Sequence, residues 1–163
     1  HECRLCALLI LVELFKKTKD ETRKQEIVDF YLAHTLRINN WDLVDLSAKD
    51  IVGEYLVDKD RSVLYQLADS SLLWDQRIAI IATFAFIRRN DYQDILDLSR
   101  RLLYHKHDLM HKAIGWMLRE MGKRDKMKLT GFLDSYSKEM PRTMLRYSIE
   151  KLSPEERVFY MKK

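Results

Sequence analysis

Three segments of the chain share one pattern at a regular spacing, and this repetition constrains the fold more than any other feature. Each segment opens with a cation, continues with about ten mostly apolar residues and closes on basic residues. The segments are RLCALLILVELFKK from Arg4, RIAIIATFAFIRR from Arg77 and KAIGWMLREMGKR from Lys112. Arg77 and Lys112 lie 35 positions apart, and Arg4 and Arg77 lie 73 apart, about twice that spacing. A period in this range, built from helices, predicts a solenoid of stacked repeats.

Other segments fill the remaining slots of this pattern. The segment from Trp41 to Leu56 lies between the first two copies, and a weaker copy begins at Pro141. Amphipathic helices are expected between the copies, with Asp60, Asp91 and Asp125 near helix starts. Their expected ranges are Glu21–His34, Ser62–Ala68, Tyr92–Leu103 and Lys126–Ser137. The chain has only 4 Gly and 2 Pro, too few turn residues for a β-rich fold.

We therefore expect an all-α, right-handed α-solenoid of HEAT-like helical repeats that forms one domain over residues 1–163. The basic copies are the candidates for the inner row of helices. Their leading cations, Arg4, Arg77 and Lys112, would form a stripe on that face, and a cation at a helix start opposes the helix dipole. Because repeat arrays need polar caps and this chain enters an apolar helix at once, we expect the N-terminal repeats of such an array to be lacking.

Composition narrows the class of protein. Hydrophobic residues make up 47% and charged residues 33%, which indicates a folded, soluble domain, and a net charge of +4 permits a polyanionic partner. No apolar run approaches the roughly 20 residues that a membrane helix needs. A signal peptide would place its charges before the apolar run, whereas here Lys16 and Lys17 follow it. We expect a cytoplasmic protein with no membrane contact.

Cysteine and histidine offer few ligands for a cofactor. Cys3 and Cys6 open an apolar helix, so buried thiols are favoured over a redox or metal site. His105, His107 and His111 cluster near a helix start. His107 and His111 are four residues apart, but a metal would need a third ligand in fixed geometry beside this pair. We expect histidines that face DNA or solvent, and neither a metal nor a cofactor.

The stretch INNWDLVDLS carries the clearest candidate site. Asn39 and Asn40 can cap a helix that begins near Trp41, and on that helix Trp41 and Asp45 share one face. A purely structural interpretation remains open, in which the acidic residues stabilise the helix start and Trp41 packs at a repeat junction.

Four segments together carry a more specific pattern. They are NNWDLVDLSAKDIVGEYL (39–56), LLWDQRIAIIATFAFIRRND (72–91), KHDLMHKAIGWMLREMGKRD (106–125) and MPRTMLRYSIEKL (140–152). In this order and spacing they resemble the AlkD-like DNA alkylation repair family, which consists of HEAT-like-repeat DNA glycosylases. The resemblance spans nearly the whole chain but lacks the N-terminal repeats of the family.

The resemblance implies roles for four residues. Asp45 matches the catalytic carboxylate of the family. Trp41 and Trp116 match two aromatic walls at the lesion, and Arg77 matches a cation that contacts the DNA backbone. Members of the family excise positively charged N3- and N7-alkylated purines without drawing the base into a pocket.

The residue types suit this chemistry independently. Loss of a cationic purine builds positive charge at the sugar C1′ and releases a neutral base, so no general acid is needed. A carboxylate can stabilise that charge and position water, and aromatic faces attract developing cations. No lysine is expected at helical spacing from Asp45, so a covalent Schiff-base step is not favoured.

The expected partner is double-stranded DNA containing alkylated purines, with no obligate protein partner. The candidate phosphate contacts are Lys112, Arg119, Arg142 and Arg146, each of which could equally be a solvated surface cation. Lys112 is favoured among them because it shares a helix face with Trp116. Trp74 is interpreted as packing. The alternative function is a catalytically inactive HEAT-repeat scaffold that binds DNA or protein.

Overall fold

The computed structural model describes residues 1–162 and divides the chain into two compact units, His1–Phe86 and Ile87–Lys163. The regular elements of the described residues are helical, which confirms the all-α expectation. The right-handed course of a solenoid and the single domain over residues 1–163 stay predictions. Across residues 1–162, no helix has both the length and the apolar character needed to cross a membrane.

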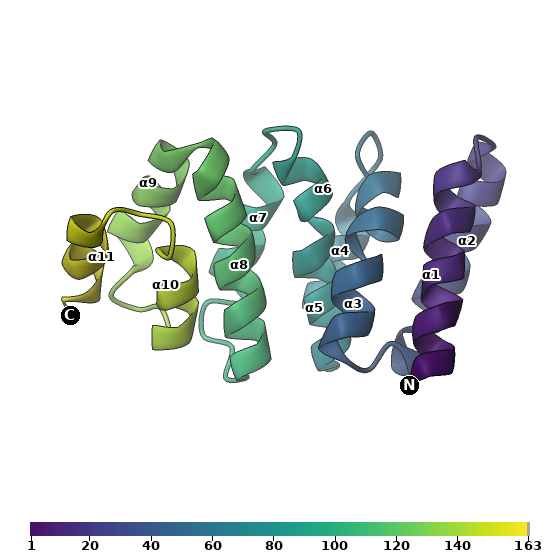
Figure 1. Cartoon of the computed structure of the whole chain (residues 1–163), viewed down its shortest axis with the longest axis horizontal. Helices are drawn as coiled ribbons and strands as arrows, with labels where there is room; N and C mark the ends of the chain where they lie inside the picture. Colours follow the sequence, from purple (N-terminus) through teal and green to yellow (C-terminus); the bar gives the residue numbers. More distant parts are fainter. Residues whose placement is uncertain (163) are drawn as a thin grey trace. The chain divides into compact units, whose positions relative to one another are not determined.

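In the first unit, one row of helices lies in front of another (Figure 1). The helix α3 packs between α1 and α5 in the front row, and α4 packs against α5 from behind. The short helix α6 spans the boundary of the unit. The elements are α1 (Glu2–Lys17), α2 (Glu21–Ala33), η1 (Thr35–Arg37), α3 (Trp41–Ser47), η2 (Lys49–Gly53), α4 (Ser62–Ala68), α5 (Leu73–Ala82) and α6 (Phe84–Ile87).

In the second unit, α8 is the central element, and α7, α9 and α10 all contact it. The helices α8 and α10 lie side by side in front, with α7 and α9 behind them (Figure 1). The bounds are α7 (Gln93–Arg101), α8 (Asp108–Arg124), α9 (Lys126–Tyr136), α10 (Arg142–Ser148) and α11 (Pro154–Met161).

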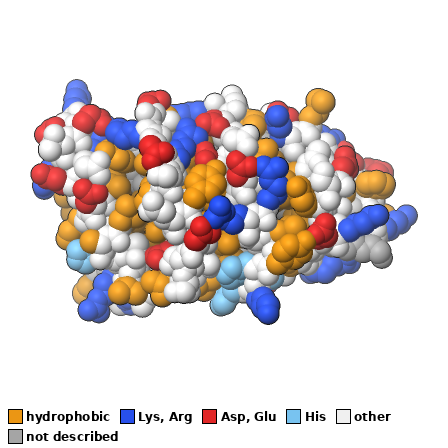
Figure 2. Space-filling model, turned by 180° about the vertical axis from the view of Figure 1, so that it is seen from behind, with side chains coloured by type: hydrophobic (Ala, Val, Ile, Leu, Met, Phe, Trp, Pro, Cys, Tyr) orange, Lys and Arg blue, Asp and Glu red, His pale blue; other side chains and the backbone are white. Residues whose placement is uncertain are grey.

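The surfaces of both units mix charged and apolar side chains. Seen from behind, basic and acidic side chains are interspersed with hydrophobic ones (Figure 2).

Most expected helix starts agree with the structure. Asn40 caps α3 by accepting a hydrogen bond from the backbone N–H of Trp41 at 2.8 Å, and Asp125 caps α9 through Lys128 N at 3.0 Å. Asp60 and Asp91 lie one residue before the caps of α4 and α7 and accept only 3.4 Å bonds from the backbone.

Two of the three helices that carry the repeated pattern, α5 and α8, begin earlier than their leading cations suggested. Arg77 is the fifth residue of α5, and Lys112 is the fifth residue of α8. Neither cation lies in the first turn, so the argument that they oppose the helix dipole is wrong. The expected run from Arg77 also breaks at Thr83, whose hydroxyl donates to Ile80 O at 2.6 Å, a bond that bends helices.

Two glycines allow helices to approach closely. A Cβ on Gly53 would lie 2.4 Å from Ala82 O, and one on Gly115 would lie 2.6 Å from Met144 O. Any larger residue would push η2 away from α5, or α10 away from α8. These contacts therefore fix where the site-bearing helices lie within each unit.

The expectation that Cys3 and Cys6 are buried is wrong, because both are exposed. The core face of α1 is formed instead by Leu8, Val12 and Phe15, which recur at helical spacing. The cysteines fall outside that stripe.

Candidate active site

Asp45 of α3 and Arg77 of α5 form a bidentate ion pair in the first unit. Arg77 Nε donates to Asp45 Oδ1 at 2.9 Å, and Nη2 donates to Oδ2 at 2.8 Å. The Arg77 side chain is only 5% exposed, and that of Asp45 is 17% exposed. Two parallel bonds from a planar guanidinium fix both the position and the plane of the carboxylate.

The burial of Arg77 follows from its place on α5. The residues that follow it, Ile78 to Ala82, are completely buried, so the helix is enclosed in the unit. A guanidinium in such a place needs a charged partner, and α3 supplies it from the neighbouring position. The sequence interpretation of Arg77 as part of an exposed stripe of cations is therefore wrong.

Trp41 lies one turn before Asp45 on the same helix. Its side chain is 53% exposed, which is unusual for a residue this large and apolar. Because residues four apart share a helix face, the indole and the carboxylate lie next to each other along α3. The first unit thus presents an exposed aromatic ring beside a fixed carboxylate.

A buried hydrogen-bond chain holds α3 from the other side. Ser47 Oγ donates to Leu43 O at 2.5 Å, and Tyr31 OH of α2 lies 2.8 Å from Ser47 Oγ. Burial of the phenol, with a further contribution from the charge of Asp45, raises the pKa of Tyr31. Tyr31 was not among the residues singled out from the sequence, because an isolated tyrosine in an amphipathic helix gives no signal.

Lys49 contradicts the expectation that no lysine lies beside Asp45. It is four residues after Asp45, and its Nζ donates to the backbone oxygen of Asp45 at 2.6 Å. It also lies 3.9 Å from Asp50 Oδ2. Lys49 begins the π-helical turn η2, a type of turn that is frequent at functional sites.

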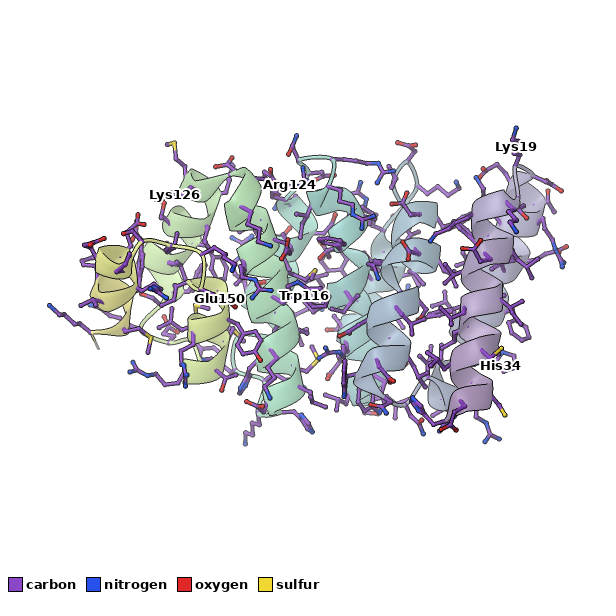
Figure 3. The ribbon with its side chains drawn as sticks, viewed as in Figure 1. Lys19, His34, Trp116, Arg124, Lys126 and Glu150 are labelled. Carbon is purple, nitrogen blue, oxygen red and sulfur yellow. The ribbon has the colours of Figure 1, made fainter. Side chains whose placement is uncertain are left out.

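Trp116 belongs to the second unit, on the middle of α8 (Figure 3). It is partly buried, and its Nε1 donates to Glu120 Oε1 at 3.2 Å, while Lys123 Nζ lies 2.8 Å from the same oxygen. Glu120 was missed in the sequence, although its position four residues after Trp116 is the spacing that predicts such a contact.

Each of the predicted phosphate contacts lies in the second unit and has a neighbour there. Lys112 and Arg146 line a hollow of about 390 Å³ between α8 and α10. Hydrogen bonds from Lys112 and then Thr143 hold the pKa of Asp108 below its usual range. Arg119 pairs with Glu150, and Arg142 Nη1 donates to the backbone oxygen of Met161 at 3.0 Å.

The clustered histidines organise the start of α8. His107 is the cap, and its Nδ1 accepts from Leu109 N at 3.1 Å. His105 Nδ1 accepts from His107 N at 3.0 Å, and His111 contacts the backbone oxygen of His105. Burial, followed by the charges of His111 and His107, lowers the pKa of His105.

The structure thus brings together Asp45 and Arg77, with Trp41 one turn away, and places Lys112, Trp116 and Arg119 on α8. The convergence of both groups on one cleft stays a prediction, since they belong to different units.

Comparison with known proteins assigns the family. No curated protein and no solved structure matches this chain. A family described as DNA alkylation repair enzyme matches residues 1–152. Because the match covers all but the last eleven of the 163 residues, the chain belongs to the DNA alkylation repair enzyme family.

Proposed function

We propose that the protein is a monofunctional DNA glycosylase that hydrolyses the N-glycosidic bond of positively charged N3- and N7-alkylated purines in double-stranded DNA. Lys49 lies beside Asp45, but its Nζ is engaged with the backbone oxygen of Asp45, so water is the nucleophile in this proposal. The observation that carries this proposal is the Asp45 carboxylate, fixed in orientation by Arg77 and adjacent to the exposed ring of Trp41. Family membership supports DNA as the substrate.

The geometry of the ion pair suits a group that acts on charge. A carboxylate has about four lone-pair sites, and Arg77 takes one on each oxygen. The remaining sites can face C1′ of the sugar and an attacking water. Because Arg77 already holds the carboxylate, little reorganisation is needed when positive charge develops on the sugar, which is the condition for strong electrostatic catalysis.

The aromatic residues would supply contact surface for the sugar and the damaged nucleotide. The π faces of Trp41 and Trp116 attract positive charge, at about 0.5–2 kcal/mol each. Exposure of Trp41 leaves its face available to DNA. Arg77 acts in this proposal as the residue that positions Asp45, because its guanidinium is buried and engaged with the carboxylate.

The decisive experiment measures release of 7-methylguanine from methylated duplex DNA under single-turnover conditions. Asp45→Asn should slow excision about 100-fold, the usual effect of removing one electrostatic stabiliser. It should not weaken binding to a duplex with an uncharged lesion mimic, because a carboxylate repels phosphate in the ground state.

The matched control is Asp42→Asn, the same change one turn earlier on α3. Asp42 accepts from Leu43 N at 2.8 Å and serves the helix start, so this variant should excise at nearly the wild-type rate. Full activity of folded Asp45→Asn protein would overturn the catalytic role of Asp45. A wild-type protein that binds DNA but releases no base would favour the inactive scaffold instead.

A further inference from the structure

A hollow in the second unit gathers cations that the proposed chemistry does not use. It measures about 400 Å³ and lies among the end of α8, the start of α9 and the segment that joins α10 to α11. Among the described residues, its charged lining consists of Arg119, Lys123, Lys126, Lys151 and one carboxylate, Glu156. The hollow is therefore predominantly positive and large enough for a phosphate group.

Surface ion pairs engage these cations but do not neutralise them as a group. Four cations share three carboxylates, two of which do not line the hollow. The three lysines are each more than 40% exposed, and ion pairs of exposed lysines contribute little free energy. The pairs are Arg119–Glu150, Lys123–Glu120 at 2.8 Å, Lys126–Glu156 at 2.6 Å and Lys151–Glu150 at 3.3 Å.

One donor at the hollow lacks an acceptor. Arg119 Nε is buried and makes no hydrogen bond within residues 1–162, although Glu120 Oε1 lies 3.7 Å away. Buried donors are nearly always satisfied, so an unsatisfied one on a cation points to an anionic acceptor.

The surrounding helices reinforce the positive potential. The helix α9 begins at Lys126, and α11 begins directly after Ser153, so two helix N-termini adjoin the hollow. Leu129 and Leu152 contribute an apolar lining. An apolar wall limits screening by water and strengthens attraction for an anion.

We propose that this hollow binds a phosphate of the DNA backbone, as a second point of attachment in the unit that does not contain Asp45. The inference rests on the proposed function, in that DNA is the source of the phosphate. Lys123, Lys126 and Lys151 are the new contacts, and Arg119 joins them. The site supplies affinity without reading sequence.

The first test compares two double variants that remove equal charge. Lys126→Ala/Lys151→Ala empties the hollow of two cations, whereas Lys128→Ala/Lys138→Ala removes two exposed lysines that do not line it. Affinity for an unmodified duplex is measured by fluorescence anisotropy over a salt series. The first variant should bind about tenfold or more weakly at about 0.1 M salt, with a salt slope reduced by about 0.9, the value for one lost phosphate contact, and the control much less. Equal losses in both variants would overturn the proposal.

The second test reverses the sign of the effect. Glu156→Gln removes the carboxylate of the hollow but keeps an oxygen that can accept from Ser153 N in the capping box of α11. It should tighten duplex binding several-fold, whereas Glu155→Gln on the neighbouring exposed residue should tighten it less. No difference between the two would contradict the proposal.

The source of the phosphate and the fate of the proposed function are resolved separately. If inorganic phosphate binds the wild-type protein but the lysine variants bind duplex alike, the hollow serves a small phosphate and the DNA proposal fails. Weakened duplex binding by Lys126→Ala/Lys151→Ala supports the phosphate site even if the wild-type protein releases no 7-methylguanine. Excision by the wild-type protein with unchanged duplex binding in the variants overturns the phosphate site alone.

Discussion

The two units hold their charged side chains in opposite ways. In the first, Asp45 and Arg77 meet in one bidentate geometry beneath the surface. In the second, Arg119 and Lys151 both pair with one carboxylate, Glu150, which is 45% exposed. The enclosed pair is suited to stabilise charge at a fixed point, whereas the exposed network is suited to attract a polyanion of variable position.

The contrast arises from packing rather than from composition. The residues that follow Arg77 on α5 are all buried. If the pair broke, the guanidinium would be left buried without a charged partner. Glu150 lies in the solvent-exposed turn after α10, where Lys151 and then Arg119 lower its pKa while water solvates the rest of the carboxylate. The same residue types therefore form a rigid site in one unit and an adaptable surface in the other.

The largest expected effect is on the enclosed pair. Arg77→Met should reduce the free energy of unfolding by about 3 kcal/mol, because it leaves a carboxylate partly buried without its partner. Asp45→Asn/Arg77→Met should recover much of this loss, since both charges are gone. Urea unfolding of the single and double variants measures the coupling. A double variant that is folded but inactive would separate the stability of the pair from its role in excision.

The same cycle on Arg119→Gln and Glu150→Gln serves as the control. These side chains are more exposed, so their coupling should be too small to measure in urea unfolding and should vanish first in salt. A coupling as large as that of Asp45 and Arg77 would break the distinction between the units.

The second expected effect concerns aromatic surface. Trp41→Ala should leave the free energy of unfolding within about 0.5 kcal/mol of wild type, because the ring is half exposed. It should slow excision of 7-methylguanine about tenfold and weaken duplex binding, since both contact area and cation attraction are lost. Trp74→Ala, on the partly buried Trp74 of α5, should do the reverse and mainly lower stability. Similar profiles for the two variants would contradict the assignment of Trp41 to DNA.

The smallest expected effect is the response of two buried tyrosines to high pH. Burial is the main cause that raises the pKa of Tyr31 in the first unit, and burial followed by a hydrogen bond to Asp134 raises that of Tyr160 to about 12 in the second. A raised phenol pKa contributes stability that is fully present below about pH 10 and is lost as pH rises through the folded-state pKa. Tyr160→Phe should therefore flatten the loss of stability between about pH 10 and 12. Spectrophotometric titration in which all tyrosines ionise near pH 10 would refute this.

The ends of the intervening helices were predictable because local signals set them. The expected helix Ser62–Ala68 matches α4, and the others agree to within a few residues. Asn40 and Asp125 could be recognised as caps from position alone. Arg77 could not be placed, because its expected helix start followed the apolar pattern, whereas α5 extends back to Leu73.

Spacing along a single helix paired Trp41 with Asp45, whereas Arg77 and Trp116 were singled out by the resemblance to the family. Trp41 and Asp45 share a face at four residues, and the same rule applied to Trp116 and Glu120, and to Asp45 and Lys49, would have found two contacts that were missed. Contacts between helices gave no such signal. Tyr31 and Ser47 are 16 residues apart, and nothing local to either residue predicts that they meet.

The sequence by itself determined that the chain is helical and which residues could carry chemistry, because helix periodicity, caps and residue type are properties of neighbours along the chain. Only the tertiary structure decided what those residues face. The close approach of α3 and α5 placed the guanidinium of Arg77 against Asp45 rather than in solvent, whereas Glu150, the partner of Arg119, stayed at the surface. Burial depends on how helices pack, and it sets whether a charge is held in one geometry or left to exchange partners.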